Sequence, residues 1–147
     1  NHLGVNPRGD LECVATNRFA FMLVKMLIQK VRFQLTEIAQ VVTNLLSNAS
    51  KYSWPGSTLH AFCGLEGDKF IVKVTDHGAG ISREDISKVF TPFFRVDSAD
   101  VRAVPGAGLG LTIVKSIIEL HDGQVYIESE KDSGTTVTFT IPAVIAS

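Results

Sequence analysis

The segment "NLLSNASKYS" (residues 44–53) decides how this chain folds. It ends a run in which apolar residues recur at i, i+3, i+4 and i+7, the spacing of a helix that buries one face. The run predicts an amphipathic helix from Leu35 to the turn "SWPGS" at 53–57. Its apolar members are Ile38, Val41, Val42, Leu45, Leu46 and Ala49.

Two asparagines stand in this helix, although the asparagine amide competes with helical backbone hydrogen bonds. At about 100° per residue, Asn44, Asn48 and Lys51 fall within roughly 60° of one another, beside the buried face. Amide oxygens suit Mg²⁺, which takes further ligands from waters and phosphates. An ammonium suits phosphate as a point charge. A solvated polar stripe would have the same pattern, so the helix alone leaves both interpretations open.

Two glycine-containing segments adjoin regular elements. In "DHGAG" (76–80), a carboxylate at a strand end can accept from an exocyclic amine, while the glycines let backbone approach a flat ring. "GAGLG" (106–110) runs into a helix, where exposed N–H groups and the positive dipole end hold phosphate. Its spacing matches neither the Rossmann fingerprint nor a P-loop. Taken singly, the first could be a plain turn and the second a flexible linker.

The remaining patterns are mostly hairpin-like. Strands are expected at 58–63 and 69–75 around Gly67, and at 124–129 and 135–142 around Ser133. A short helix should run from a Ser82 cap through Val89. A second amphipathic helix, Leu111 to His121, should end at Asp122-Gly123, with Gly123 in the left-handed cap position. These elements predict an α+β fold, a two-layer sandwich with a mixed, mostly antiparallel sheet packed on helices.

Composition narrows the function classes. The 147 residues fit one domain, and 45% hydrophobic with 20% charged residues indicates a folded globular chain. A net charge of -1 argues against a partner that is duplex nucleic acid. Cys13 and Cys63 are too few for a disulfide framework or a zinc site, which favours a reducing compartment. His60, His77 and His121 have no metal-like spacing.

The N-terminal part is the least informative. Residues 1–18 are polar and turn-rich without a clear period, and the longest apolar run, 19–28, is too short to span a bilayer. We expect 1–34 to be a linker or a divergent N-terminal element and 35–147 to be the functional domain. Because the chain begins at Asn1 without methionine, we expect it to be part of a longer protein.

The order and spacing of the motifs give the most specific indication. "NLLSNASKYS", "DHGAGI", "VFTPFFRVD" and "GAGLGLTIVK" resemble the N, G1, F and G2 boxes of the catalytic ATP-binding domain (HATPase, GHKL type) of two-component sensor histidine kinases. "GTTVTFTIP" (134–142) is similar to the final strand of that domain. The resemblance covers about residues 35–142 and implies a Bergerat-type ATP-binding fold. Gyrase, Hsp90 and MutL share the asparagine and DxGxG elements but generally lack the F and G2 pairing in this form.

The resemblance implies roles for individual residues. Asn48 would be the Mg²⁺ ligand, Lys51 would reach a phosphate, and Arg95 would approach the γ-phosphate, so these are the candidate catalytic residues. Asp76 would accept from the adenine amino group and Tyr52 would lie against the ring. A flexible lid would span about 95–106, with the aromatic residues of 90–94 as its hinge. The full set implied to bind nucleotide is Asn44, Asn48, Lys51, Tyr52, Asp76, Gly78, Gly80, Ile81, Phe90, Arg95, Gly106, Gly108, Leu109, Gly110, Leu111 and Thr135.

The function implied is binding of ATP with Mg²⁺ and supply of the γ-phosphate to a histidine on separate dimerisation and phosphoacceptor helices. From there the phosphate would pass to the receiver domain of a response regulator. No upstream histidine precedes an acidic residue, so the phosphoacceptor is expected outside this chain. Glu37 stands where the family commonly has a basic residue. The isolated domain is expected to be monomeric and cytoplasmic, or the cytosolic part of a membrane-anchored receptor. The alternatives are a degenerate, non-catalytic interaction module and an ATP-gated ATPase.

Overall fold

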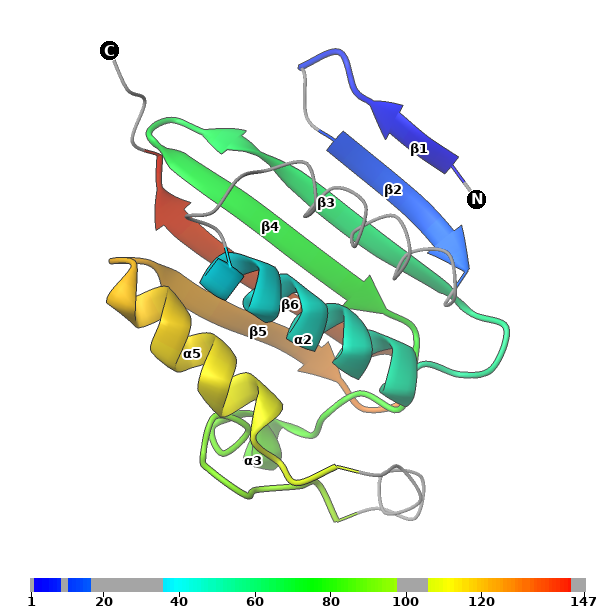
Figure 1. Ribbon diagram of the computed structural model, residues 1–147. Helices are drawn as coiled ribbons and strands as arrows, with labels where there is room; N and C mark the ends of the chain where they lie inside the picture. The colour runs from blue at the N-terminus through cyan, green and yellow to red at the C-terminus, as the bar shows by residue number, and fades with distance from the viewer. Residues whose placement is uncertain (1, 9–10, 17–35, 98–105, 144–147) are drawn as a thin grey trace.

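The computed structural model describes residues 2–8, 11–16, 36–97 and 106–143. Their strands form one six-stranded sheet in the order β1-β2-β3-β4-β6-β5 (Figure 1). Every neighbouring pair in this sheet is antiparallel. The strands are β1 (His2–Val5), β2 (Leu11–Thr16), β3 (Thr58–Glu66), β4 (Lys69–Asp76), β5 (Gln124–Glu130) and β6 (Gly134–Pro142).

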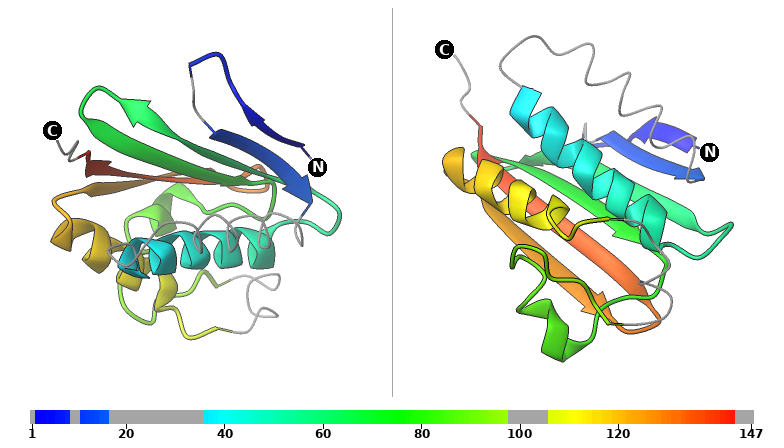
Figure 2. Two further views of the ribbon diagram at one scale, coloured as in Figure 1. Left: turned by 45° about the horizontal axis from the view of Figure 1, so that its top comes forward. Right: turned by 60° about the horizontal axis from the view of Figure 1, so that its bottom comes forward.

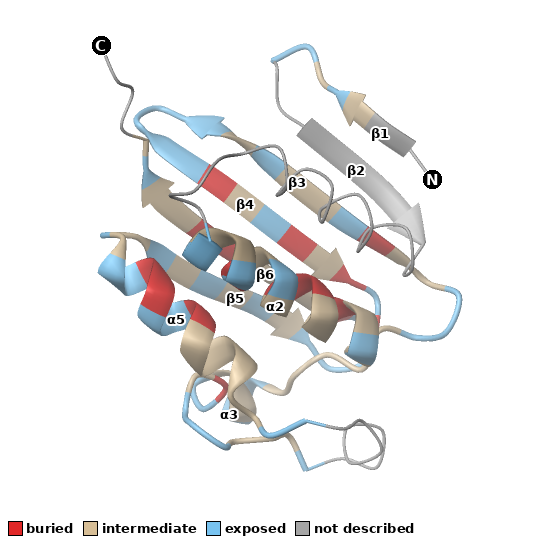
Figure 3. Ribbon diagram, in the orientation of Figure 1, coloured by how far each residue is buried: buried red, intermediate tan, exposed pale blue. Residues whose placement is uncertain are grey.

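Two helices, α2 (Thr36–Tyr52) and α5 (Gly110–Leu120), cover one face of the sheet (Figure 2). The predicted apolar face of α2 is confirmed, because Val41, Leu45, Leu46 and Ala49 are buried while Ile38 and Val42 pack partly against the core. The buried side chains gather between the helices and strands β3, β4 and β6 (Figure 3). Completing this core are Leu59, Val74, Val114, Ile117, Ile118 and Phe139. Fully burying one such side chain stabilises the fold by about 1.5–3 kcal/mol.

The two hairpins bring distant segments together. β3 and β4 meet across Gly67-Asp68, with Gly67 at φ 61°, as the pattern predicted. β5 and β6 meet across residues 131–133, where Asp132 takes φ 66°. β4 also pairs with β6, in a register that sets Asp76 opposite Thr135. The segment after β4 and the start of β6 therefore lie at the same end of the sheet.

Several local expectations were wrong. The helix after Ser82 is the short α3 (Arg83–Ile86) and does not continue to Val89, because the hydrogen bonds tighten to i→i+3, as from the Lys88 N–H to the Asp85 carbonyl. The left-handed residue after α5 is Asp122 (φ 58°), not Gly123. Gly123 is needed for space, since a Cβ there would lie 2.2 Å from the Thr140 carbonyl oxygen.

The strands β1 and β2 were not predicted. They extend the sheet beyond β3 with a continuous register from Leu11↔Cys63 to Thr16↔Thr58. A sheet neighbour can supply the hydrogen bonds of a strand whose own sequence has no clear alternation, which is why periodicity missed them. Within the described part of the chain, no helix has the length and apolar character needed to cross a membrane.

Candidate functional site

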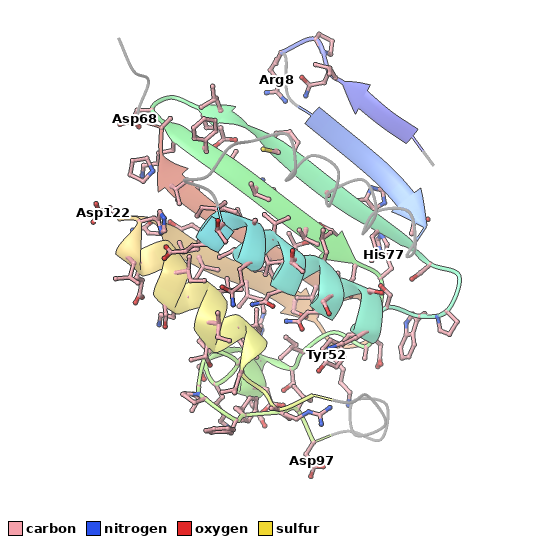
Figure 4. The ribbon with its side chains drawn as sticks, in the orientation of Figure 1. Arg8, Tyr52, Asp68, His77, Asp97 and Asp122 are labelled. Atoms are coloured by element: carbon pink, nitrogen blue, oxygen red, sulfur yellow. The ribbon has the colours of Figure 1, made fainter. Side chains whose placement is uncertain are left out.

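A cavity of about 260 Å³ opens between α2, the helix-covered face of the sheet and the segments on either side of residues 98–105. Residues 98–105 themselves, which make up most of the expected lid, lie outside the described residues. The polar flank of α2 forms one wall, because Asn44, Asn48 and Lys51 all line the cavity. The same apolar burial that orients the helix therefore aims these side chains, and Tyr52, at the end of α2, lines the cavity as well (Figure 4).

Asp76 forms the end of the cavity at the last residue of β4. Its side chain is 7% exposed, and burial raises the pKa of this carboxyl to about 6, against the lowering effect of backbone hydrogen bonds from Thr135 and Gly78. Asp76 Oδ1 and Asn44 Nδ2 are buried with no hydrogen-bond partner among the described residues. A buried polar atom without a partner costs about 1–3 kcal/mol. One acceptor and one donor are thus available to a ligand.

The loop after Asp76 touches two other elements through its glycines. A Cβ on Gly78 would lie 1.8 Å from the Tyr52 carbonyl oxygen, so only glycine allows this loop to form its bridge to Ser53. Gly80 has φ 64°, and a Cβ there would lie 2.0 Å from the Glu130 carbonyl oxygen. The loop is consequently clamped between the end of α2 and the β5–β6 hairpin.

The glycine segment forms the opposite side of the cavity. It leads into α5, whose first turn, like that of any helix, presents N–H groups without intrahelical partners. A Cβ on Gly110 would lie 3.5 Å from Asn48 Nδ2, so the Asn48 amide faces the start of this helix. Arg95 Nη1 donates to the Gly106 carbonyl at 3.2 Å, and the Phe93 N–H donates to the Gly108 carbonyl at 3.1 Å. The two ends of the intervening segment are therefore joined.

The cavity gathers every residue implied to bind nucleotide except Gly78 and Phe90. Gly78 does not line the cavity and instead joins its loop to the end of α2. Phe90 lies away from the cavity, where its carbonyl accepts from Thr112 Oγ1 and its ring lies 5.5 Å from Lys115 Nζ. Sequence reasoning missed the rest of the lining, although strand alternation could have found part of it, since Val74 lies two residues before Asp76 and Val137 two residues after Thr135. The missed lining residues are Leu45, Ser47, Ala49, Val74, Ala79, Val89, Phe94, Val96, Ala107, Ile127 and Val137.

The cavity thus combines an apolar lining that ends in a buried carboxylate with two asparagines and the start of a helix. Residues 34–145 match the model of the histidine kinase-, DNA gyrase B- and HSP90-like ATPases. The chain belongs to this family. Among curated relatives of this ATPase domain, the sensor histidine kinase WalK of Bacillus subtilis is 42% identical over 108 residues, which is 72% of this chain and 18% of WalK. The sensor protein SrrB of Staphylococcus aureus is 39% identical over 110 residues, 75% of this chain and 19% of SrrB.

Solved structures agree with this family. The domain superposes on the mycobacterial sensor histidine kinase MprB with a TM-score of 0.68 and 25% identity, covering 88% of this chain and 97% of that one. It is similar to the catalytic domain of the histidine kinase ThkA (TM-score 0.65, 26% identity, 89% and 95% covered). Full-length ShkA in complex with AMPPNP has a TM-score of 0.61 and 28% sequence identity, with 76% of this chain and 22% of that one covered.

This chain is therefore a histidine-kinase-type ATPase domain with the α+β fold expected from its sequence. It spans less than a fifth of the length of the curated relatives WalK and SrrB. Among the described residues, no group of three or more histidine, cysteine, aspartate or glutamate side chains could hold a metal ion. A metal in the cavity would instead need amide oxygens and oxygens from a ligand, which is the ligand set that Mg²⁺ accepts.

Proposed function

We propose that this domain binds ATP with Mg²⁺ and supplies the γ-phosphate to a histidine on the dimerisation and phosphoacceptor helices of a longer kinase. The phosphate would then pass to the receiver domain of a response regulator. One observation carries the proposal: Asp76 Oδ1 and Asn44 Nδ2 lie buried without partners, among the described residues, in a cavity whose other end is a helix start. The base of a nucleotide would satisfy the Asp76 acceptor, and its phosphates would satisfy the Asn44 donor.

The Asp76 end fits the adenine base. A carboxylate is an obligate acceptor, so it complements an exocyclic amine and repels a carbonyl at the same position. Apolar side chains of Val74, Ile127 and Val137 line the cavity nearby and suit the faces of an aromatic ring. Tyr52 would lie against the ring from α2.

The other end fits a triphosphate. The N–H groups at the start of α5 would hold phosphate oxygens, with Lys51 adding positive charge from the α2 wall. The Asn48 amide, which faces Gly110, would offer its oxygen to Mg²⁺. When bound, the Mg²⁺ ion neutralises part of the triphosphate charge.

Transfer from such a site depends on positioning and charge neutralisation rather than on covalent chemistry by the protein. Arg95 would contribute charge at the γ-phosphate from the segment that its bond to Gly106 closes. The acceptor histidine would come from the separate helices, so the domain alone would bind nucleotide without labelling itself. The relatives SrrB and WalK are named as sensors, and we place this domain in the cytosol as part of a signalling receptor.

The proposal is tested by titrating the chain with ATP in the presence and absence of Mg²⁺. Asn48→Ala should weaken Mg²⁺-dependent affinity by about a hundredfold, whereas Thr43→Ala, an exposed position on the same helix, should leave it unchanged. A separately supplied phosphoacceptor helix pair should then be labelled by γ-³²P-ATP. Absence of nucleotide binding by the unaltered chain contradicts the proposal.

The same experiment separates the two alternatives. Nucleotide binding without any labelling of the helix pair would favour a degenerate, non-catalytic module. Steady ATP hydrolysis by the chain alone, with no phosphohistidine formed, would favour an ATP-gated ATPase of the gyrase and Hsp90 kind.

A further inference from the structure

Ser129 of β5 lies where the loop after β4 meets the β5–β6 hairpin. Its hydroxyl oxygen accepts from the Ile81 N–H at 2.8 Å, and its O–H donates to the Gly134 carbonyl at 2.9 Å. It also lies 2.7 Å from Thr135 Oγ1. Ser129 does not itself line the cavity, whereas Ile81 and Thr135 do. One half-buried hydroxyl therefore joins three segments directly behind the Asp76 end of the site.

Because each hydroxyl has a single hydrogen, the direction of these hydrogen bonds is fixed. A serine hydroxyl has one hydrogen and two lone pairs. The Gly134 carbonyl can only accept, so it takes the hydrogen, and the Ile81 N–H occupies one lone pair. The Thr135 hydroxyl must then donate its own hydrogen to the second lone pair of Ser129. With its single hydrogen used in this way, Thr135 Oγ1 has only lone pairs left for a ligand.

This orientation matters because Thr135 is the cross-strand partner of Asp76, and both line the cavity. Asp76 Oδ1 has no hydrogen-bond partner among the described residues, and it is an acceptor as long as the carboxyl is ionised. The base end of the site then presents acceptors side by side. The amino group of an amino-substituted purine offers two N–H donors to such an end, one for each acceptor, whereas a keto-substituted purine places a carbonyl with only lone pairs there and keeps a single N–H on the neighbouring ring nitrogen.

We propose that Ser129 is a positioning residue for base specificity: it holds the Thr135 hydroxyl as an acceptor beside Asp76, and so makes the site prefer an amino-substituted purine nucleotide over a keto-substituted one. This inference rests on the proposed nucleotide-binding function. Ser129 acts through Thr135 and needs no contact with the nucleotide.

The test compares the affinities of the full 147-residue chain for Mg-ATP and for Mg-ITP, which carries a carbonyl where ATP has its amino group. Calorimetric titration should show that Ser129→Ala lowers the ATP-to-ITP affinity ratio by about five- to tenfold, the worth of one hydrogen bond. Thr135→Val should lower it to a similar degree. Because the effect passes through Thr135, the double variant should show the same ratio as Thr135→Val alone.

Two further variants serve as controls. Ser129→Thr keeps the hydroxyl and should restore the ratio. At the next position of the same hairpin, Thr136 Oγ1 and Thr75 Oγ1 form a comparable hydroxyl pair, 2.8 Å apart. Thr136→Val removes this pair and should leave the ratio unchanged. Ser129→Cys keeps the shape of the side chain but has only a weak hydrogen-bonding group, so it should also lower the ratio. It replaces Ser129→Ala if that variant does not fold.

The inference is overturned if Ser129→Ala weakens ATP and ITP equally, if its effect adds fully to that of Thr135→Val, or if the unaltered chain binds both nucleotides alike. These results differ from failure of the proposed function, in which the unaltered chain binds neither nucleotide.

Discussion

The cavity has two walls of different construction. The helix wall is α2, whose far side is embedded in the core through Val41 and Leu46, at 0% and 2% exposure. The loop wall consists of residues 93–96 and 106–109, where Phe93 is 71% exposed and has φ 64°. Hydrogen bonds from Phe93 to Gly108 and from Arg95 to Gly106 join its two parts. One wall is thus positioned by buried apolar area and the other by hydrogen bonds to backbone carbonyls, which predicts different responses to substitution.

The largest contrast should come from removing apolar side chains. Leu46→Ala in the helix wall should lower the free energy of unfolding by about 3 kcal/mol, because it leaves a cavity in the core. Val96→Ala in the loop wall, where the side chain is only half-buried, should cost less than about 1 kcal/mol. Urea denaturation measures both values. Equal losses would mean that the loop wall is as much part of the core as the helix.

The next effect concerns Asp76, which lies between the two walls. Asp76→Asn should raise the free energy of unfolding at pH 7 by about 1–2 kcal/mol, because it removes a charge whose burial is unfavourable, as the raised pKa indicates. The same variant should bind ATP far more weakly. Thermal unfolding and calorimetric titration give the two readouts.

The pH dependence has a defined sign. The pKa of Asp76 is about 6 in the folded chain against 3.8 for an ordinary aspartate, so the folded state binds the extra proton. Its contribution to stability is fully present below pH 3.8 and is lost as the pH rises through 6. The stability difference between Asp76→Asn and the unaltered chain should therefore shrink from pH 7 to pH 5. A constant difference would place the origin of the effect elsewhere.

A smaller effect is expected in the loop wall itself. Arg95→Ala should reduce phosphate transfer to a supplied phosphoacceptor by about tenfold while changing ATP affinity by less than about threefold, since its proposed role is at the γ-phosphate. Arg95→Lys, which keeps the charge, should retain part of the transfer rate. Loss of affinity and transfer in parallel would instead assign Arg95 to ground-state binding.

The smallest effect tests the backbone of the same wall. Phe93→Gly should raise the free energy of unfolding by about 0.5 kcal/mol, because relief of the positive φ outweighs the greater entropy of glycine in the unfolded chain. Phe93→Ala keeps the Cβ and should give no such gain. Chemical denaturation of the two variants in parallel checks this, and a stability loss in both would show that the exposed ring makes a stabilising contact.

Prediction from sequence succeeded where one local period controls the outcome. The burial of Val41, Leu45, Leu46 and Ala49 follows from helical spacing, and that spacing also directs Asn44 and Asn48 to one side. The hairpin turns around Gly67 and Asp132 were likewise predicted from their turn residues. It failed where another element decides the conformation. Gly123 is required by the Thr140 carbonyl, and β1 and β2 extend the sheet through the pairing of β2 with β3.

The sequence by itself determined the family, the two amphipathic helices and nearly all of the polar residues that line the cavity, because each of these is written in short motifs and local periods. Only the tertiary structure decided that Asp76 is buried opposite Thr135, that Phe90 faces away, and that Ser129 joins three segments behind the site. Those properties depend on the register between strands distant in the chain. No local pattern encodes that register, since it is set by the packing of the whole sheet.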